Sequence, residues 1–368
     1  MSAISAQERA AMGEGFARLL LEKCNEPDLR RVMTTETGHD VDLWRAMAEM
    51  GITALVVPTE YDGIGAGPVE VEAIMEEAGS VLLGGPLLSS AVLAATLLAG
   101  SDDEDAKIRL LPGIASGETI VTVACTGDAG SWQASGVTVT AEPLDNRWNL
   151  NGVASFVMSA NIADVLLVIA HTPIGIGCFE VVPDNAKIEP LQSWDPTLRM
   201  SRIVFEDTEA IPIAGLDGSA FEHAVDLARV ALAGEQAGAS RRIFDITVDY
   251  LKTRVQFGRP IGGFQALKHM AADLLIEVES ATSAARAAAQ AMDADAPDKD
   301  ALISLAAFAC ADAFSQVAAS AIQMHGGIAF TWEHPAHLYL RRARADAQLF
   351  GASDAHRERF VTAMEKAA

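Results

Sequence analysis

Two short segments of this chain decide its fold, Arg254-Val-Gln-Phe-Gly-Arg-Pro-Ile261 and Gln323-Met-His-Gly-Gly-Ile-Ala-Phe330. They lie far apart in the sequence, and each comes at the end of an Ala-, Leu- and Val-rich stretch that is typical of a helix. The planar guanidinium of Arg254 suits a pyrophosphate, because it donates several hydrogen bonds at once. Gly326 and Gly327 let backbone N–H groups approach a phosphate or a ribose closely. Taken singly, each segment also fits an ordinary helix end, with a solvated arginine in the first and a glycine cap in the second.

The composition limits the functions that the chain can have. With 368 residues, half of them hydrophobic, it is long enough for two or three domains and a large core. Its formal net charge of −23 argues against binding to nucleic acid, whose phosphates need a basic face. The same charge argues against a polybasic membrane contact. We expect no apolar run to reach the roughly 20 residues of a membrane span.

The cysteines and the first residues predict a cytoplasmic protein. Cys24, Cys125, Cys178 and Cys310 are scattered and show neither metal-ligand nor redox spacing. We therefore expect free thiols in a reducing compartment. Residues 1–9 lack the basic and then apolar pattern of a secretory signal.

The spacing of apolar residues predicts three domains: a helical domain over 1–117, a small β-domain over 118–213 and a helical bundle over 214–368. Helices are expected at 6–21, 41–50, 69–78, 89–98, 220–255, 266–292 and 299–325, and strands at 119–126, 137–141, 148–156, 164–170, 176–182 and 201–205. Residues 110–118 are expected to form a helix end and a linker. No strand is followed by Gly-x-Gly-x-x-Gly, which argues against a Rossmann site.

This order of domains, together with local motifs, resembles the acyl-CoA dehydrogenase family. The motifs are the turn Val57-Pro-Thr-Glu-Tyr-Asp-Gly-Ile-Gly65, the linker at 111–118, the strand entry Trp194-Asp-Pro-Thr-Leu-Arg199 and the two segments quoted above. Residues 330–342 look most like actinobacterial members that act on steroid side chains and other bulky acyl-CoAs. Several of those members are α2β2 assemblies of two different subunits. The implied fold is α+β multidomain, with a β-barrel-like middle domain and a C-terminal four-helix bundle.

The resemblance also implies an activity and a cofactor. Family members convert an acyl-CoA thioester to the 2-enoyl-CoA, with a glutamate as the base and FAD as the hydride acceptor. Their two segments hold the ADP half of an FAD that belongs mostly to a neighbouring subunit. Carried over to this chain, the cofactor-binding residues are Arg254, Gln256, Phe257, Gln265, Gln323, Gly326 and Gly327. The family usually has a further glycine where this chain has Ala329.

The resemblance makes two absences visible, because neither family position of the catalytic glutamate carries a glutamate here. One position, after the last arginine-rich helix, is Phe350, and the other, on the first helix of the bundle, is Ala228. Neither side chain can take a proton. Asp346 and Asp354 lie near the C-terminal position, and we interpret both as solvated helix-face or cap residues.

Glu235 is the best local substitute for the missing base. It lies seven residues beyond Ala228, about two helical turns, so it points to nearly the same face of the helix. A carboxylate on an otherwise apolar helix face needs a reason. Catalysis is one reason, and an ion pair with a nearby arginine is another. The arginines weighed for that pair are Arg229, Arg241 and Arg242.

The side that would meet the flavin ring departs from the family pattern as well. The family's Thr-Glu-Pro…Gly-Ser-Asp stretch reads Cys125-Thr-Gly-Asp-Ala-Gly-Ser-Trp132, and its Trp-Ile-Ser/Thr strand reads Phe156-Val-Met158. An apolar Met158 thus replaces a hydroxyl that normally bonds the flavin. The chain keeps the motifs that reach a neighbour's FAD and has lost those that would hold its own.

Two other clusters receive a structural interpretation. His325, His334 and His337 fit no standard metal spacing, so we expect surface or packing histidines and no metal. The run Arg341-Arg-Ala-Arg344 is interpreted as a solvated helix face or a subunit contact.

Two functional hypotheses remain. In the first, the chain is a self-sufficient homo-oligomeric flavoenzyme of β-oxidation or steroid catabolism that uses Glu235 as its base. In the second, it is the base-lacking partner of a homologous subunit that seats the FAD, and the loss of both glutamates favours this reading.

Small residues at 228, 231, 233 and 234 could widen a pocket for a bulky acyl group. An electron-transfer flavoprotein or a similar acceptor is the expected redox partner. A scaffold without redox chemistry is weaker, because it leaves the two ADP motifs without a purpose.

Overall fold

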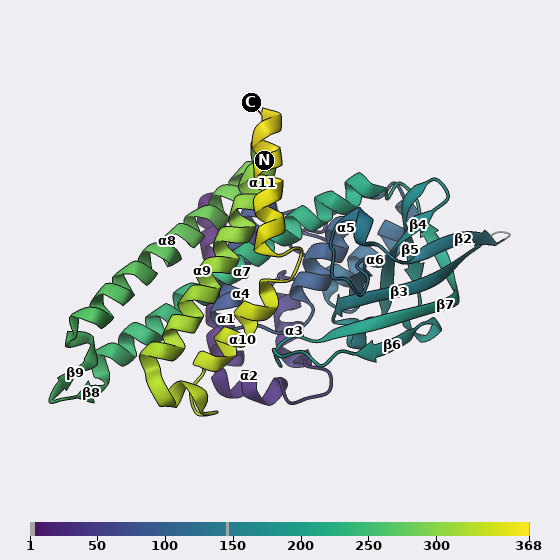
Figure 1. Ribbon diagram of the computed structural model, residues 1–368. Coiled ribbons are helices and arrows are strands. Elements are labelled where there is room, and N and C mark those ends of the chain that lie inside the picture. The colour runs from purple at the N-terminus through teal and green to yellow at the C-terminus, as the bar shows by residue number, and fades with distance from the viewer. Residues whose placement is uncertain (1–3, 145–146, 368) are drawn as a thin grey trace. The chain divides into compact units, whose positions relative to one another are not determined.

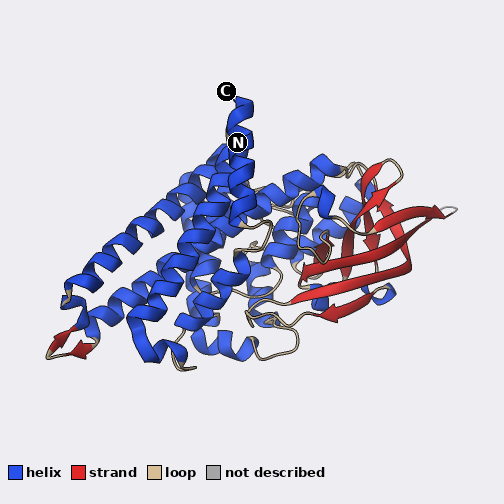
Figure 2. Cartoon of the chain, in the orientation of Figure 1, coloured by secondary structure: helices blue, strands red, loops and turns tan. Residues whose placement is uncertain are grey.

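The computed structural model describes residues 4–144 and 147–367, and Figures 1 and 2 show helices as its main component. The helices are α1 (Ala6–Lys23), α2 (Glu26–Val32), α3 (Val41–Glu49), α4 (Pro68–Ser80), α5 (Ala95–Ala99), α6 (Glu104–Ser116), α7 (Gly218–Thr253), α8 (Gln265–Asp293), α9 (Lys299–His325), α10 (Ala336–Asp346) and α11 (Ser353–Ala367). The strands are β1 (Val121–Ala124), β2 (Thr140–Leu144), β3 (Arg147–Met158), β4 (Val165–Thr172), β5 (Gly175–Val181), β6 (Lys187–Pro190), β7 (Met200–Ile213), β8 (Val255–Gln256) and β9 (Arg259–Pro260).

The chain divides into two compact units. The barrel unit contains Arg30–Val71 and Gly84–Arg229 together with the residues up to Arg9. The bundle unit contains Ala10–Leu29, Glu72–Leu83 and the chain from Val230 onward. Helices α1, α4 and α7 each begin in the barrel unit and continue into the bundle unit.

The strands of the barrel unit close on themselves. Their order is β4-β2-β3-β7-β5, and β5 pairs with β4 again, so the sheet returns to its starting strand. The junction of β4 with β2 is narrow and rests on the pair Thr140 and His171. β1 runs parallel to β4, and β6 runs antiparallel to β7. Figure 1 shows β3 and β7 as the long antiparallel pair of this unit, and the closed sheet confirms the predicted barrel-like β-domain.

The barrel is filled because its strands alternate apolar and polar residues. On β7, Ser201, Ile203 and Phe205 are buried and the residues between them are less so, as the two-residue period of a strand requires. Leu150 and Phe179 reach the same core from β3 and β5. The β-branched and aromatic residues that suggested strands in the sequence are thus the residues that fill the barrel.

Helix α6 ends within the segment where a helix end was predicted. Residues 110–118 were expected to form a helix end and a linker, and the helix ends at Ser116, with Pro112 inside it. The buried Leu111 and Ile114 anchor this last turn in the core. The helix ends at Gly117, whose φ of 72° is the left-handed conformation of a glycine cap.

Helix α9 corrects the expectation that no apolar run is long enough to span a membrane. Among the described residues, the helical stretch Lys299–Phe330 has the length and hydropathy of a membrane-crossing helix, although no such run was expected. About 61% of its most apolar window is buried inside the fold. The helix packs against α8, α10 and α11, so its apolar side chains form the centre of the bundle.

Helices α4 and α7 approach each other closely within the bundle unit. A Cβ added at Gly79 would lie 1.9 Å from the Glu235 carbonyl oxygen, and one at Gly238 would lie 1.8 Å from that of Glu76. A Cβ at Gly234 would lie 2.6 Å from the carbonyl oxygen of Glu72. Only glycine allows backbones to come this near, so these positions fix Glu235 against α4.

Candidate cofactor and active site

The first motif forms a small hairpin at the end of α7, which Figure 2 shows as two short red strands at the tip of the helices. The Arg254 N–H donates to the Tyr250 carbonyl at 2.8 Å and ends the helix. The Ile261 N–H donates to the Arg254 carbonyl at 2.8 Å and closes the hairpin. Phe257 and Gly258 form the loop with φ of 53° and 79°, the left-handed pair that a two-residue hairpin turn needs. Phe257 is 91% exposed at the tip.

The second motif follows α9 directly. Gly326 ends the helix with a φ of 65°, and its N–H donates to the Ile322 carbonyl. Gly327 has no left-handed φ, and an added Cβ would meet nothing within 4 Å. Neither conformation nor packing within this chain therefore requires glycine at Gly327. Its bare backbone leaves room for a ligand to approach.

These residues form a donor set that fits the ADP half of FAD. Arg254 is exposed and makes no ion pair with the residues that the structure describes. The amides of Gln256, Gln265 and Gln323 are exposed as well. A guanidinium, several amides and an open glycine backbone are the groups that bind a pyrophosphate and a ribose. The residues present thus fit the group, and their assignment to FAD stays a prediction.

Neither family position of the base carries a proton acceptor in the structure. Ala228 is fully buried on α7. Phe350 follows α10, is 1% exposed and has a φ of 57°. A left-handed φ is uncommon for a bulky residue and marks a strained backbone. A buried phenyl ring therefore occupies the C-terminal position of the family's glutamate.

Glu235 lies in a buried ion pair with Arg342 of α10. Arg342 is not among the three arginines weighed from the sequence. Arg229 pairs with Asp226 at 2.5 Å, and Arg241 pairs with Glu279. A proton on Glu235 would leave the buried Arg342 without its counter-charge, which is costly inside the fold. The contact therefore supports the structural reading of Glu235.

Arg342 also differs from the interpretation of residues 341–344 as a solvated helix face, because its side chain is fully buried. It donates to the carbonyls of Leu82 at 3.2 Å and Leu83 at 3.3 Å. One turn earlier, the Tyr339 hydroxyl donates to the Ser80 carbonyl at 2.7 Å, and burial raises the pKa of Tyr339, so the phenol stays protonated. α10 is thus bonded to the end of α4, and the Glu235 pair belongs to this network.

The two aspartates near the C-terminal position lie in different environments. Asp346 is 1% exposed on α10, so its interpretation as a solvated residue is wrong. Apolar residues recur at Ala336, Tyr339 and Ala343 on that helix, and this spacing places Asp346 on the same buried face. Asp354 is exposed on α11 and pairs with Arg357 at 3.4 Å.

The stretch that would meet the flavin ring uses its polar groups within the barrel unit. The Thr126 hydroxyl donates to the Ser131 carbonyl at 2.5 Å, and the Ser155 hydroxyl donates to Asp128. Asp128 in turn pairs with Arg202 at 3.1 Å. Met158 is buried and offers no hydroxyl. Nothing in these contacts replaces the flavin-binding hydroxyl that the family pattern places here.

The thiol of this stretch is inert. Cys125 is buried, and burial raises the pKa of its thiol to about 12. A thiol reacts as its thiolate, which this environment suppresses. Cys24, Cys178 and Cys310 are buried too, and none of them forms a disulfide within the described residues.

The histidines near the second motif pack against aromatic rings. His325 and His334 have ring centroids 4.2 Å apart, and His337 meets Trp332 at 4.9 Å. Within residues 4–144 and 147–367, no group of three or more His, Cys, Asp or Glu side chains is placed to hold a metal ion.

Sequence reasoning missed Arg342 as the partner of Glu235, although one signal was present. Leu338 and Tyr339 lie four and three residues before Arg342, the spacing of one helix face. A face that carries Leu338 and Tyr339 is turned to the core, so an arginine on it needs a buried acid. The run of arginines around Arg342 concealed this pattern.

Comparison with known proteins identifies the family. Residues 7–118 match the acyl-CoA dehydrogenase N-terminal domain, and residues 218–364 match the acyl-CoA dehydrogenase C-terminal domain. The chain is 35% identical over 346 residues to the acyl-CoA dehydrogenase IpdE2 of Mycobacterium tuberculosis, and this match covers 93% of each chain.

Two solved structures share the whole fold. The ChsE4-ChsE5 complex from Mycobacterium tuberculosis superimposes with a TM-score of 0.91 at 25% identity, over 100% of this chain and 99% of that one. The Tcur3481-Tcur3483 steroid ACAD G363A variant gives a TM-score of 0.88 at 28% identity, over 98% of each chain. The present chain belongs to the acyl-CoA dehydrogenase family, and the cofactor of its chemistry is FAD.

Proposed function

We propose that this chain, as an acyl-CoA dehydrogenase, is the base-lacking subunit of a heteromeric complex, in which it supplies the ADP-half contacts to an FAD seated mainly in a homologous subunit. That second subunit would carry the catalytic glutamate. The complex would oxidise a bulky acyl-CoA thioester to its trans-2-enoyl-CoA.

The observation that carries the proposal is the state of the three candidate positions for a base. Ala228 and Phe350 have no acid–base group, and Glu235 is engaged by a buried arginine. A general base must reach the proton that it removes and be free to accept it. None of the three meets both conditions, and this supports a base that a second chain supplies.

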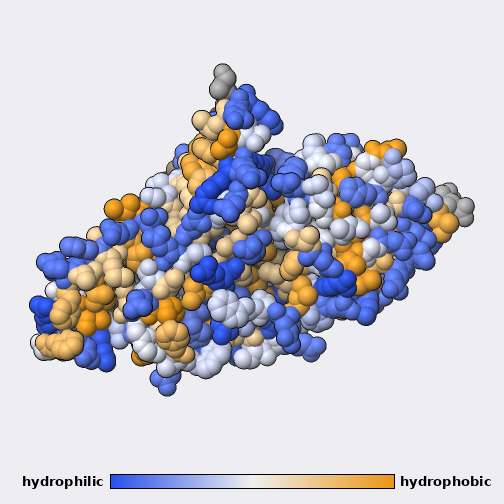
Figure 3. All heavy atoms as spheres, viewed as in Figure 1, coloured by the Kyte–Doolittle hydropathy of each residue, from blue (hydrophilic) through white to orange (hydrophobic). Residues whose placement is uncertain are grey.

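The exposed aromatic residues around the two motifs support a partner at this end of the bundle unit. Phe257 is 91% exposed, Phe330 79% and Trp332 59%. Hydrophobic atoms gather over the β8–β9 end in Figure 3 (orange and pale orange). Large exposed apolar residues in a cluster mark an interaction surface. We assign this surface to the homologous subunit, because these aromatics belong to the two motifs that would bind its cofactor or directly follow them in the sequence.

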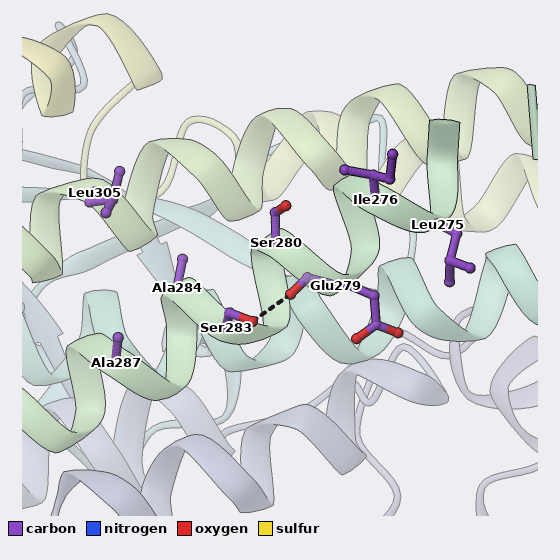
Figure 4. Close-up of a pocket in the computed structure, with 8 residues that line it drawn as sticks. All are labelled: Leu275, Ile276, Glu279, Ser280, Ser283, Ala284, Ala287 and Leu305. Carbon is purple, nitrogen blue, oxygen red and sulfur yellow. Dashed lines mark hydrogen bonds between the residues drawn. The ribbon is translucent and has the colours of Figure 1, made fainter. Parts of the chain in front are cut away.

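A second apolar surface lies on α8 and α9. Figure 4 shows a shallow hollow in which Ser280, Ser283, Ala284 and Ala287 lie along α8, with Leu305 opposite them on α9. The Ser283 hydroxyl bonds to the carbonyl of its own helix at Glu279, 2.8 Å away, so it presents little polarity. Small side chains let a helix of another subunit approach closely. The hollow thus suits a helix of the same homologous subunit.

Each part of the motifs has a distinct role under the proposal. FAD, when bound, takes the hydride from the β-carbon of the thioester. The guanidinium of Arg254 would bind the pyrophosphate and neutralise part of its charge. The open backbone at Gly326 and Gly327 would accommodate the phosphate or ribose, and the exposed amide of Gln323 would donate to it.

The substrate class rests on narrower ground. Ala228, Ala231 and Ala233 are small and buried on α7, where larger side chains would fill more volume. Gly234 does not contribute to a pocket for a bulky acyl group, because the backbone of Glu72 packs against it. The similar Tcur3481-Tcur3483 protein is a steroid ACAD by its name. On these grounds we propose a steroid side-chain or other bulky acyl-CoA.

The remaining assignments concern the electron acceptor and the compartment. We propose an electron-transfer flavoprotein or a similar acceptor, because reduced FAD must pass its electrons on before the next turnover. We also propose a cytoplasmic location, which the four buried free thiols support.

Reconstitution with the homologous subunit tests the proposal. The acyl-CoA-dependent reduction of an artificial electron acceptor should be absent from each chain alone and present when both are purified together. Glu235→Gln in this chain should leave the rate of the folded complex unchanged. Glutamine in place of the partner's glutamate should abolish it. Turnover by this chain alone that is lost in Glu235→Gln would instead establish the self-sufficient homo-oligomer.

A further inference from the structure

Three rings in the bundle unit join the two cofactor motifs. Tyr250 lies on α7, one turn before Arg254, and His325 is the last residue of α9, directly before Gly326. His334 follows the second motif. The ring centroids of Tyr250 and His325 are 4.6 Å apart, those of His325 and His334 are 4.2 Å apart, and those of Tyr250 and His334 are 6.4 Å apart. We call these residues the three-ring cluster.

The backbone connects the cluster to each motif, through a hydrogen bond on one side and a peptide bond on the other. The Tyr250 carbonyl accepts from the Arg254 N–H at 2.8 Å, where the hairpin begins. On the other side, the peptide bond joins His325 to Gly326, whose N–H caps α9 at the Ile322 carbonyl. A displacement of the His325 ring would therefore shift the glycine turn relative to Arg254.

The hydrogen bonds of His325 determine which ring nitrogen carries its proton. Nδ1 lies 2.8 Å from the Ala321 carbonyl oxygen, which can only accept, so Nδ1 holds the hydrogen. In the neutral ring Nε2 is then unprotonated. It is buried and has no hydrogen-bond partner among the described residues. A proton on Nε2 would place a charge at a site without an acceptor.

The neighbours of His325 do not compensate for such a charge. The titratable groups in ring contact with it are Tyr250 from α7 and His334 from the turn before α10. His334 Nδ1 accepts from the Ala336 N–H at 3.2 Å, and neither ring contact supplies a negative charge. Burial lowers the pKa of His325, although the bond to Ala321 opposes this. The neutral ring is thus the form that the packing selects.

We propose that His325 is a positioning residue, whose neutral ring holds the Arg254 hairpin and the Gly326–Gly327 turn in the relative position that grips the ADP half of FAD. The proposal rests on the assignment of both motifs to FAD made above. The proposal also predicts a pH dependence. The two motifs bind FAD less tightly when the His325 ring is protonated, because the charged ring leaves the cluster. Since the pKa of His325 is lowered, the grip is complete above the ordinary histidine pKa of about 6.5 and weakens as the pH falls below it.

The release of FAD from the assembled holoprotein, followed by flavin fluorescence after dilution at pH 7.5 and pH 5.5, tests this role. His325→Leu removes both the ring and the donor and should accelerate release about tenfold at pH 7.5. His325→Phe keeps a ring that cannot be protonated, so release should stay near the wild-type rate and lose its acceleration in acid. His223→Phe, which changes an exposed histidine on α7, should follow the wild type at both pH values.

A further variant separates this inference from the assignment on which it rests. If Arg254→Ala does not accelerate release, the motifs do not hold FAD, and both statements fall. If Arg254→Ala accelerates release while both His325 variants match the wild type at both pH values, the assignment stands and the positioning role is overturned. Acid acceleration that persists unchanged in His325→Phe overturns it as well, independently of the folding of His325→Leu.

Discussion

At the scale of single residues, the structure separates buried charges that hold the fold from residues that face a ligand. Glu235 and Arg342 are buried and paired, whereas Arg254 is exposed without an ion pair among the described residues. A buried pair resists the loss of either partner, because the remaining charge has no solvent. An exposed arginine is available to a ligand from outside the chain.

The first prediction concerns Glu235. We expect Glu235→Gln to lower the free energy of unfolding by about 3–5 kcal/mol, because it leaves the buried Arg342 uncompensated. Thermal and urea unfolding of the variant should show this loss, and Glu22→Gln on the exposed face of α1 should show none. An unchanged stability together with lost turnover would make Glu235 the base.

The second prediction concerns Glu72, a buried carboxyl of the bundle unit. Burial, and then the charge of Glu76, raise the pKa of Glu72 to about 8, although Arg286 opposes the shift. Its Oε1 is buried without a hydrogen-bond partner in the described part of the chain. Between about pH 4.3 and 8 the unfolded chain releases this proton while the folded chain keeps it, so stability falls as the pH rises through that window.

Glu72→Gln removes the titrating group and should remove this slope. We expect the variant to gain several kcal/mol over the wild type at pH 8.5 and little at pH 5. Urea unfolding at both pH values measures the difference, with Glu14→Gln on α1 as an exposed control. Equal gains at the two pH values would show that Glu72 is already charged in the folded protein.

At the scale of elements, the two motifs follow helix ends that are connected by packed rings. The hairpin ends α7, the glycine turn ends α9, and Tyr250 and His325 meet between them with ring centroids 4.6 Å apart. The C-terminal end of a helix exposes carbonyl acceptors, so donors to a phosphate at these two ends must come from the side chains and backbone N–H groups of the segments that follow. The exposed side chains beside them are the part of the bundle unit that a second subunit would cover.

The third prediction tests that surface. Phe257→Ser with Phe330→Ser should weaken association with the homologous subunit at least about tenfold, because exposed aromatics at an interface carry much of the binding energy. Analytical ultracentrifugation measures the association, and the melting temperature of this chain should stay unchanged. Ile174→Ser, at a residue that is 97% exposed in the barrel unit, is the matched control. Association that resists the double substitution would place the interface elsewhere.

At the scale of the whole molecule, the three long helices α7, α8 and α9 could be predicted from the sequence, whereas α2, β6 and α11 were not. The three long helices begin and end within two residues of their expected positions, because their apolar period extends over many turns. α2 and β6 were missed, since seven and four residues are too few to show a period. The end of α6 at Ser116 lies within the segment 110–118 where a helix end was expected, although Pro112 stands inside the helix.

The candidate site was predictable only where it consists of local motifs. The ADP-half residues follow one another in the sequence, so their pattern could be recognised. The partner of Glu235 could not, because Arg342 lies 107 residues away and the pair depends on how α10 meets α7. The hydrogen bonds of the Thr126 and Ser155 hydroxyls within the barrel unit could not be predicted either, since they depend on the turns of that unit.

The measurement that tests the central claim most directly is the flavin absorbance between 350 and 500 nm of this chain purified alone and after co-expression with a homologous subunit that carries a base glutamate. The account predicts a colourless chain alone and a yellow, active complex with less than one FAD per chain. Stoichiometric FAD in the chain alone, with turnover, would contradict it and return the chain to the self-sufficient dehydrogenases.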